Sequence, residues 1–466
     1  MSTIASTAEA ARRELGGSFN GELIGPDDAS YNEGRAVFNA MIDRRPALIV
    51  RPSNAAAVSA AVEFGRSHDL PIAVRGGGHN GGGLGVVDDG IVIDLAAIKD
   101  VKVDPGARTV RVGGGATWGM VDAATNQHGM ATPSGIISTT GVGGLTLGGG
   151  IGHLARGYGL SIDSLLEAEV VLANGEIVTA SADKNSDLHW ALRGGGGNFG
   201  VVTAFTFRTH PVSNVMAGPT FWPMERATEI LQWYRAFQPS LPREMTGFFA
   251  FLTVPPVPPF PEELHMKQVC GVVWCYNGDA ASSEELFAPV LETDPLMHGV
   301  GEMPFPMIQS AFDGLYPKGE QWYWRADFVR ELSDDAIAAH TAHGTKLPTW
   351  KSTMHLYPID GAVHDVGASD SAFAYRDVAY AEVIVGVDPD PANADMIRQW
   401  TVDYYDATHP YSAGGAYVNF MMDEGQERVQ ASFRDNYDRL AAVKQKYDPA
   451  NLFRVNQNIR PVKAAV

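Results

Sequence analysis

The sequence is poor in cysteine, in long apolar runs and in basic residues. Its 466 residues include two cysteines, Cys270 and Cys275, and 54 acidic side chains against 35 lysines and arginines. The formal net charge of −19 repels phosphate groups, so we expect neither nucleic acid nor a membrane surface as a partner. No segment approaches the roughly 18 apolar residues of a membrane span. We therefore expect a soluble protein, long enough for two domains.

The two cysteines are not expected to pair. They lie five positions apart in a predicted strand, so they point to opposite faces. No spacing of His, Cys or carboxylates is typical of a metal site, and no metal is expected. Glu9 and Arg12 stand where a secretory signal would be apolar, so the first 15 residues predict a short helix. Together these features favour a reducing, cytoplasmic setting.

Glycine is abundant, but in one region. Of 51 glycines, 30 lie between Gly76 and Gly200. Valine- and isoleucine-rich segments separate the glycine clusters, which is not typical of a flexible linker. Backbone without side chains lets amide groups approach a ligand closely. The pattern predicts several ligand-binding turns within a folded domain.

The hydrophobic patterns predict an α+β fold. In the first half we expect strands at 47–50, 71–74, 90–95 and 201–209, helices at 55–68 and 187–192, and a hairpin at 168–180. After Pro211 glycine becomes rarer, prolines gather at 255–261, and amphipathic helices are expected at 228–237, 282–291 and 394–405. A second domain is expected to begin there, and the tail, 423–446, predicts one or two helices.

The loop from Gly76 to Gly81 raises the possibility of a dinucleotide site. It fits G-x-G-x-x-G and follows a predicted strand, which is typical of nicotinamide-binding proteins. In those proteins the third glycine opens a helix, whereas residues 81–90 continue here as a loop. There is no phosphate-binding G-x-x-x-x-G-K-[ST] motif. A nicotinamide-dependent dehydrogenase is therefore kept as an alternative.

Several longer motifs carry a resemblance to one family. They are Arg75-Gly-Gly-Gly-His-Asn80, the glycine run from Gly141 to Gly152, Arg193-Gly-Gly-Gly-Gly-Asn-Phe-Gly200, Ala416-Tyr-Val-Asn419 and Asn456-Gln-Asn-Ile459. In this order the chain resembles the berberine bridge enzyme-like FAD-linked oxidases of the vanillyl alcohol oxidase and p-cresol methylhydroxylase superfamily. The resemblance implies a two-domain α+β fold of the PCMH type. Residues 1–211 and 415–466 would bind FAD, and residues 212–414 would form an inserted substrate domain with an antiparallel sheet.

The resemblance also implies how the cofactor is held. His79 would be bonded covalently to FAD, and Ile137 stands where many members have a second, cysteine tether, so a single covalent bond is expected. The glycines would present backbone N–H groups to the pyrophosphate. The implied cofactor residues besides His79 are Arg75, Gly76, Gly77, Gly78, Asn80, Gly81, Ser138, Thr139, Gly141, Gly143, Gly144, Gly149, Gly200, Val201, Asn419, Asn456 and Asn458.

The resemblance implies removal of a hydride from an alcohol or amine, with dioxygen as the expected electron acceptor. A tyrosine would take the substrate proton, but Phe420 replaces the second tyrosine of the common Y-x-N-Y motif. Tyr417 or Glu382 is the expected substitute, with Tyr380 beside Glu382 on one face of a predicted strand and Asn419 beside Tyr417 on one face of another. Phe420 also leaves open a flavin-binding protein without activity.

Overall fold

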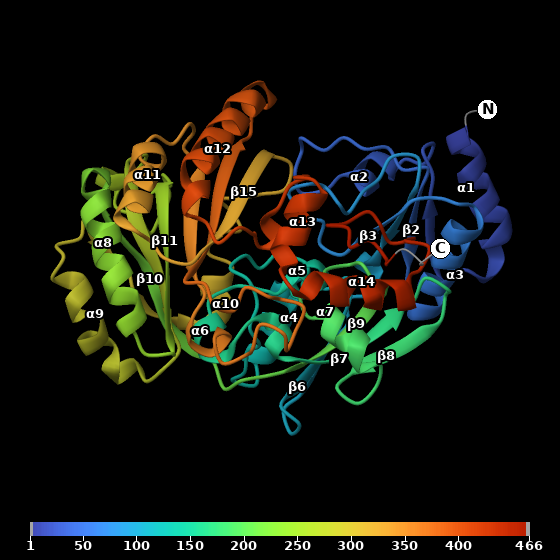
Figure 1. Cartoon of the computed structure of the whole chain (residues 1–466), viewed down its shortest axis with the longest axis horizontal. Coiled ribbons are helices and arrows are strands. Elements are labelled where there is room, and N and C mark those ends of the chain that lie inside the picture. The colour runs from blue at the N-terminus through green and yellow to red at the C-terminus, as the bar shows by residue number, and fades with distance from the viewer. Residues whose placement is uncertain (1–2, 463–466) are drawn as a thin grey trace.

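The computed structural model describes residues 3–462, which form three β-sheets covered by helices (Figure 1). The first sheet has the order β1-β2-β4-β3, and the second has the order β5-β6-β9-β7-β8. The third, largest sheet runs β13-β10-β12-β11-β16-β17-β15, with β14 also paired to β10. Pairing is parallel where β4 meets β2 and β3 and antiparallel in the third sheet.

The strands of the first two sheets are β1 Gly21–Ile24, β2 Leu48–Pro52, β3 Ile72–Arg75, β4 Ile91–Asp94, β5 Val101–Asp104, β6 Thr109–Gly113, β7 Leu165–Val171, β8 Ile177–Ser181 and β9 Val201–Arg208. Those of the third sheet are β10 Asn214–Pro223, β11 Met245–Thr253, β12 Gln268–Tyr276, β13 Met297–His298, β14 Gly301–Pro304, β15 Gln321–Val329, β16 Thr353–Pro358 and β17 Tyr380–Asp388.

The α-helices are α1 Thr3–Glu14, α2 Tyr31–Arg35, α3 Ala55–Ser67, α4 Trp118–Asn126, α5 Val142–Gly148, α6 Ala155–Tyr158, α7 Ser186–Leu192, α8 Ala227–Phe237, α9 Ser283–Leu291, α10 Phe305–Gln309, α11 Asp334–Gly344, α12 Ala394–Thr408, α13 Gln426–Phe433 and α14 Asn436–Tyr447. No helix among residues 3–462 is long and apolar enough to cross a membrane.

Except for the strand predicted around Tyr417, the expected helices and strands are confirmed, with boundaries shifted by a few residues. Val58, Ala61 and Val62, on one face of α3, are fully buried. Asn54 caps that helix, since its side chain accepts a hydrogen bond from the N–H of Ala57. No helix lies between β3 and β4, so Gly76 to Gly81 do not form the strand–turn–helix of a nicotinamide site.

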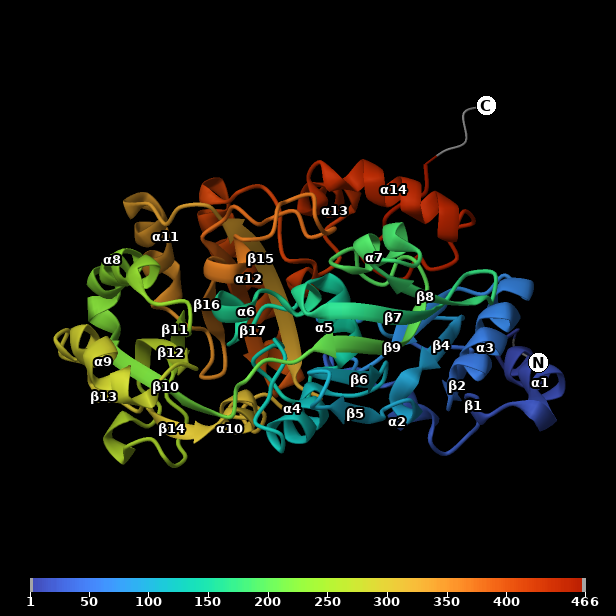
Figure 2. The same cartoon turned by 90° about the horizontal axis from the view of Figure 1, so that it is seen from below.

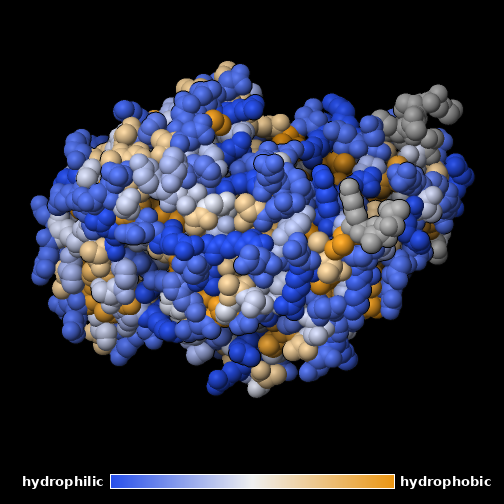
Figure 3. Space-filling model, in the orientation of Figure 1, coloured by the Kyte–Doolittle hydropathy of each residue, from blue (hydrophilic) through white to orange (hydrophobic). Residues whose placement is uncertain are grey.

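The first and the last helix of the described residues, α1 and α14, lie in the same half of the molecule. The helices α13 and α14, drawn in red, lie in the half that holds α1 and α3, drawn in blue, whereas the third sheet fills the other half (Figures 1 and 2). Contacts between α14 and α7 join the tail to the glycine-rich part of the chain. An inserted, antiparallel-sheet unit is therefore present, and its boundaries at 212 and 414 stay a prediction. The face of the molecule seen in Figure 3 is largely hydrophilic.

The two faces of the third sheet are both buried, but against different partners. On one face, Tyr380 and Ile384 of β17 pack in a core with residues of α8, α11 and α12. On the other, Val383 and Val385 belong to the core shared with the glycine-rich half. Cys270 lies in the first of these cores and Cys275 in the second, and both are free thiols. The prediction that the cysteines point to opposite faces without pairing is confirmed.

Arg156 of α6 ties the glycine-rich half to the inserted unit. Its side chain is 3% exposed, and its Nε lies 2.5 Å from Oδ1 of Asp360. The guanidinium also donates to the carbonyls of Leu241 and Pro242, at 3.1 and 2.9 Å, and to that of Met245. One buried cation thus satisfies four acceptors that all lie beyond residue 211.

We expect Arg156→Met to lower the free energy of unfolding by about 3 kcal/mol, because it leaves buried acceptors without a donor. Chemical denaturation monitored by circular dichroism measures the loss. Arg243→Ala is the matched control: it removes an ion pair to Asp365 whose side chains are both more than half exposed, and no measurable change is expected. Equal losses in the two variants would contradict the structural role of Arg156.

Candidate active site

A cavity of about 330 Å³ lies between the glycine-rich half and the third sheet. Its walls come from segments far apart in the sequence, which only the fold brings together. They include residues 75–80, 135–137, 140–141, 143–145, 195–197, 417–420 and 455–457, together with Trp322, Trp324, Thr353, His355, Tyr357, Val383 and Val385 from β15, β16 and β17. The glycine-rich end is bare backbone, and the other end is the inward face of the sheet.

Two glycine-rich loops meet at Gly77 and Gly141. A Cβ atom placed on Gly141 would lie 2.2 Å from the amide nitrogen of Gly77, and one on Gly77 would lie 2.4 Å from that of Gly141. Any side chain at either position would push the loops apart. At Gly144 and Gly197, by contrast, a Cβ would meet nothing within 4 Å, because the open space of the cavity begins at the backbone.

His79 lies in the cavity wall between Phe38 and Thr139. Its ring stacks on Phe38 with a centroid distance of 4.1 Å, and its Nε2 lies 3.1 Å from Oγ1 of Thr139. Burial, reinforced by the positive Lys318, lowers the pKa of His79 to about 4, although the Thr139 contact opposes the shift. The imidazole is therefore neutral near pH 7, and one of its two ring nitrogens carries a lone pair and no proton.

Arg75 is buried at the strand end from which the loop carrying His79 begins. It is 7% exposed, and its Nη2 lies 3.0 Å from Oδ2 of Asp94 and donates to the carbonyl of Gly34. Its aliphatic stem packs under Gly78 and Gly85. This buried ion pair fixes the strand end from which the His79 loop departs.

The structure brings most of the predicted cofactor residues to the cavity and leaves others outside its wall. The residues that line it are His79, Arg75, Gly76, Gly77, Gly78, Asn80, Gly141, Gly143, Gly144, Gly200, Asn419 and Asn456. Gly81, Ser138, Thr139, Gly149, Val201 and Asn458 do not line it. Gly81 lies against Trp324, Ser138 donates to the carboxylate of Asp313, and Gly149 packs on Phe373. These residues shape the wall from behind.

Tyr380 and Glu382 do not reach the cavity, so the expected catalytic roles of both residues are corrected here. They share one face of β17 as predicted, but that face is the one covered by helices, while Val383 lines the cavity. Glu382 accepts a hydrogen bond from Thr408 at 3.0 Å, and burial together with the negative Asp327 raises its pKa to about 8. Neither side chain can contact a ligand in the cavity.

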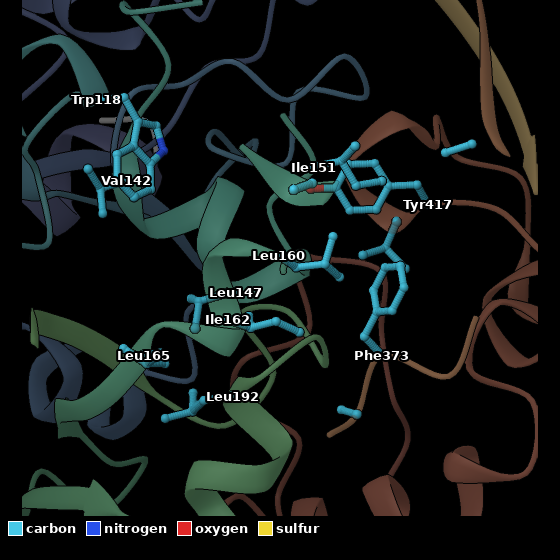
Figure 4. Close-up of a cluster of buried hydrophobic side chains, with 14 of the residues drawn as sticks. Trp118, Val142, Leu147, Ile151, Leu160, Ile162, Leu165, Leu192, Phe373 and Tyr417 are labelled. Carbon is cyan, nitrogen blue, oxygen red and sulfur yellow. The ribbon is translucent and has the colours of Figure 1, made fainter. Parts of the chain in front are cut away.

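Tyr417 lines the cavity, but the predicted strand around it is wrong. It precedes a 3₁₀ turn, Val418–Phe420, and lies beside Ile151 with Phe373 below it (Figure 4). Its hydroxyl oxygen accepts hydrogen bonds from the N–H of Gly150 at 2.9 Å and from the amide of Asn419 at 2.7 Å. Burial raises the pKa of Tyr417 to about 12, against the effect of these two donors.

Sequence reasoning missed the most polar group on the sheet side of the cavity. His355 and Tyr357, two positions apart on β16, share the inward face, and Nδ1 of His355 lies 2.6 Å from the hydroxyl of Tyr357. Phe420, in the place of the motif tyrosine, packs on Tyr357 with a centroid distance of 5.8 Å. The strand alternation of β16 could have paired these two side chains, but no motif marks them.

The residues present fit FAD. Among residues 3–462 no acidic side chain lines the cavity, so nothing there opposes an anionic pyrophosphate. The first-turn N–H groups of α5, at Gly143 and Gly144, have no partner within the helix and lie at the bare backbone. At the far end, Oδ1 of Asn456 is buried without a hydrogen-bond partner, as expected of a ligand contact. His79 lies at the junction with the sheet.

Comparison with known families and proteins agrees with this geometry. An FAD binding domain model matches residues 46–181, and a "berberine and berberine like" model matches residues 416–460. An FAD-linked oxidoreductase of Dictyostelium discoideum is 33% identical over 435 residues, which cover 91% of each chain. The xylooligosaccharide oxidase of Thermothelomyces thermophilus is 27% identical over 463 residues, covering 91% of this chain and 89% of that one.

Solved structures share the whole fold. The 6-hydroxy-D-nicotine oxidase of Arthrobacter nicotinovorans superposes with a TM-score of 0.85 at 24% identity, covering 96% of this chain and 99% of that one. A berberine bridge enzyme-like protein of Physcomitrella patens gives 0.85 at 24% identity, with both chains fully covered. At this identity the likeness shows the fold, and the predicted PCMH-type α+β architecture is confirmed.

We expect Gly141→Ala to destabilise the protein by about 1–3 kcal/mol even without FAD, because the added methyl group meets the backbone of Gly77. Gly144→Ala is the matched variant. Its methyl group points into open space, so we expect unchanged stability but a lower flavin content after purification. Thermal unfolding and the ratio of flavin to protein absorbance measure the two effects. Equal behaviour of both variants would contradict the distinction.

Proposed function

The chain belongs to the FAD-linked oxidoreductases with a berberine-like C-terminal segment, and on that premise we propose that it oxidises the carbon bearing a substrate hydroxyl while FAD is bonded covalently to His79. One observation carries the proposal: a single cavity joins the bare glycine-rich backbone to a sheet face with its own hydrogen-bonding groups. The first end fits the dinucleotide, and the second is where a substrate can contact protein side chains. FAD, when bound, supplies the acceptor for a hydride, which carries both electrons of the oxidation.

His79 has the chemical properties that a covalent bond to flavin requires. A neutral imidazole has a lone pair available for bonding, and the lowered pKa keeps the ring neutral down to about pH 4. The contacts with Phe38 and Thr139 fix the ring plane, so its free nitrogen is preoriented. No cysteine lines the cavity among the described residues, and Ile137 does, which supports a single attachment.

The substrate is proposed to be a small alcohol, and dioxygen the final electron acceptor. Relatives named as oxidases of xylooligosaccharide and chitooligosaccharide support oxidation of a hydroxyl-bearing carbon and reaction with dioxygen. The name of the nicotine oxidase keeps a neutral amine as a second candidate. The protein's own part is to hold the substrate against the cofactor, to exclude water and to receive the hydroxyl proton.

We expect the purified protein to retain its yellow colour in the pellet after acid precipitation. His79→Ala should release the flavin to the supernatant and leave the fold intact, because the loop contacts of Gly77 and Arg75 do not involve the imidazole. Absorbance of pellet and supernatant measures the attachment. Covalent flavin in His79→Ala would place the bond elsewhere.

Cys270→Ser and Cys275→Ser should leave the attachment unchanged. Both thiols are buried and neither lines the cavity, and burial raises the pKa of each to about 12, so neither supplies a thiolate. The same acid precipitation, applied to both single variants and the double variant, checks this. Loss of colour from the pellet in any of them would show a cysteine tether.

A further inference from the structure

The sheet end of the cavity is almost entirely apolar and carries no net charge. Its wall is formed by Ile136, Ile137, Phe312, Trp324, Val383 and Val385. Arg75 is the one charged side chain on the wall among residues 3–462, and it is already paired with Asp94. A charged substrate would be buried here without a counterion, and that is strongly unfavourable. The wall therefore selects a neutral, largely apolar molecule.

Two polar groups of this end are already satisfied within the protein. The hydroxyl of Thr353 donates to the carbonyl of Phe251 at 2.7 Å, and that of Tyr316 donates to the carbonyl of Lys351 at 3.4 Å. An oligosaccharide presents several hydroxyls, each of which needs a partner when it leaves water. The indole N–H groups of Trp322 and Trp324 are buried in this wall without a partner, but they can only donate, so most hydroxyl protons of an oligosaccharide would find no acceptor here.

Tyr417 can donate to a ligand but cannot accept from one. A hydroxyl oxygen has two acceptor positions, and those of Tyr417 are filled by the N–H of Gly150 and the amide of Asn419. Its raised pKa keeps the phenol protonated near neutrality. A substrate hydroxyl that must give up its proton therefore needs another acceptor.

Tyr357 has the complementary arrangement. Burial lowers the pKa of His355 to about 3 and raises that of Tyr357 well above its ordinary value, so both side chains are neutral near pH 7 and one ring nitrogen of His355 must act as an acceptor. When Nδ1 is that acceptor, the hydroxyl proton of Tyr357 points to His355 and both oxygen lone pairs remain free. The phenol then accepts from a substrate hydroxyl and can pass its own proton to His355.

We propose that the site takes a neutral, largely apolar alcohol whose hydroxyl donates its hydrogen bond to Tyr357, which His355 holds in the accepting orientation. The substrate proton passes to the oxygen of Tyr357, and the proton of Tyr357 passes to Nδ1 of His355. Tyr357 thus replaces the hydroxyl that Phe420 lacks. The inference rests on the proposed function and names its substrate class.

Binding to the holoenzyme tests the recognition directly. The flavin is first reduced under anaerobic conditions so that no turnover occurs, and calorimetry then compares 3-phenylpropan-1-ol, propylbenzene and xylobiose. We expect the aromatic alcohol to bind at least about tenfold more tightly than xylobiose. Tyr357→Phe should weaken binding of the alcohol by about tenfold and leave the affinity for propylbenzene, which lacks the hydroxyl, unchanged.

Tyr323→Phe is the control variant, because Tyr323 lies on β15 between two wall tryptophans and does not line the cavity. This variant should bind the alcohol and propylbenzene with unchanged affinity. Tighter binding of xylobiose, no binding of the alcohol, or equal weakening of alcohol and hydrocarbon in Tyr357→Phe would overturn the inference. Reduction of the oxidised flavin by xylobiose would in that case leave the proposed function standing.

Rapid-mixing measurement of flavin reduction by the alcohol tests the proton transfer. Tyr357→Phe should slow reduction by about 10²-fold or more, as expected for loss of a group that receives a proton. Tyr417→Phe should slow it less. The reverse order would assign the proton to Tyr417 and overturn that part of the inference. If no alcohol or sugar bleaches the flavin although the alcohol binds, recognition is upheld and the oxidation is not.

Discussion

The contact between Gly77 and Gly141 is the constraint on which the rest of the site depends. Two loops some sixty residues apart meet backbone to backbone, at a distance that leaves no room for a side chain. That contact sets the position of His79 on one loop and of α5 on the other, so the two walls of the dinucleotide end are fixed together. The buried pair of Arg75 and Asp94 holds the same junction from the strand side.

The dinucleotide end of the site could be predicted from the sequence because its chemistry is carried by backbone. Glycine clusters indicate a close approach of backbone to a ligand, and the family resemblance of the motifs around them implies the roles of His79 and Ile137. The predicted loops at Gly76 to Gly78 and Gly141 to Gly144 do line the cavity. Ser138 and Thr139 are predicted to contact the cofactor but do not line the cavity. A linear motif does not show which of its side chains point away from the cofactor.

The sheet end could not be predicted in the same way. Strand alternation shows that Tyr380 and Glu382 share a face, but both faces of this sheet are buried, so burial does not show which one meets the cofactor. The helices α8, α11 and α12 cover the face of the sheet that carries Glu382, so this side chain is kept away from the cavity. His355 and Tyr357 lie on the face of β16 that lines the cavity, and they belong to no motif. Tyr417 and Asn419 were correctly paired, although a 3₁₀ turn rather than a strand brings them together.

One face of the third sheet lines the cavity and the other packs against helices, and this arrangement affects how the substrate specificity of the protein can diverge. Alternate residues of β15, β16 and β17 form a replaceable panel over the cofactor, while Met354, Leu356 and Ile384, which lie between panel residues on β16 and β17, belong to a separate core. Substitutions at the panel positions can change what is admitted without disturbing either the helices behind the sheet or the loops that hold the dinucleotide. Substitutions at every second residue of three adjacent strands can therefore change substrate specificity, while the half of the molecule that binds the cofactor stays the same.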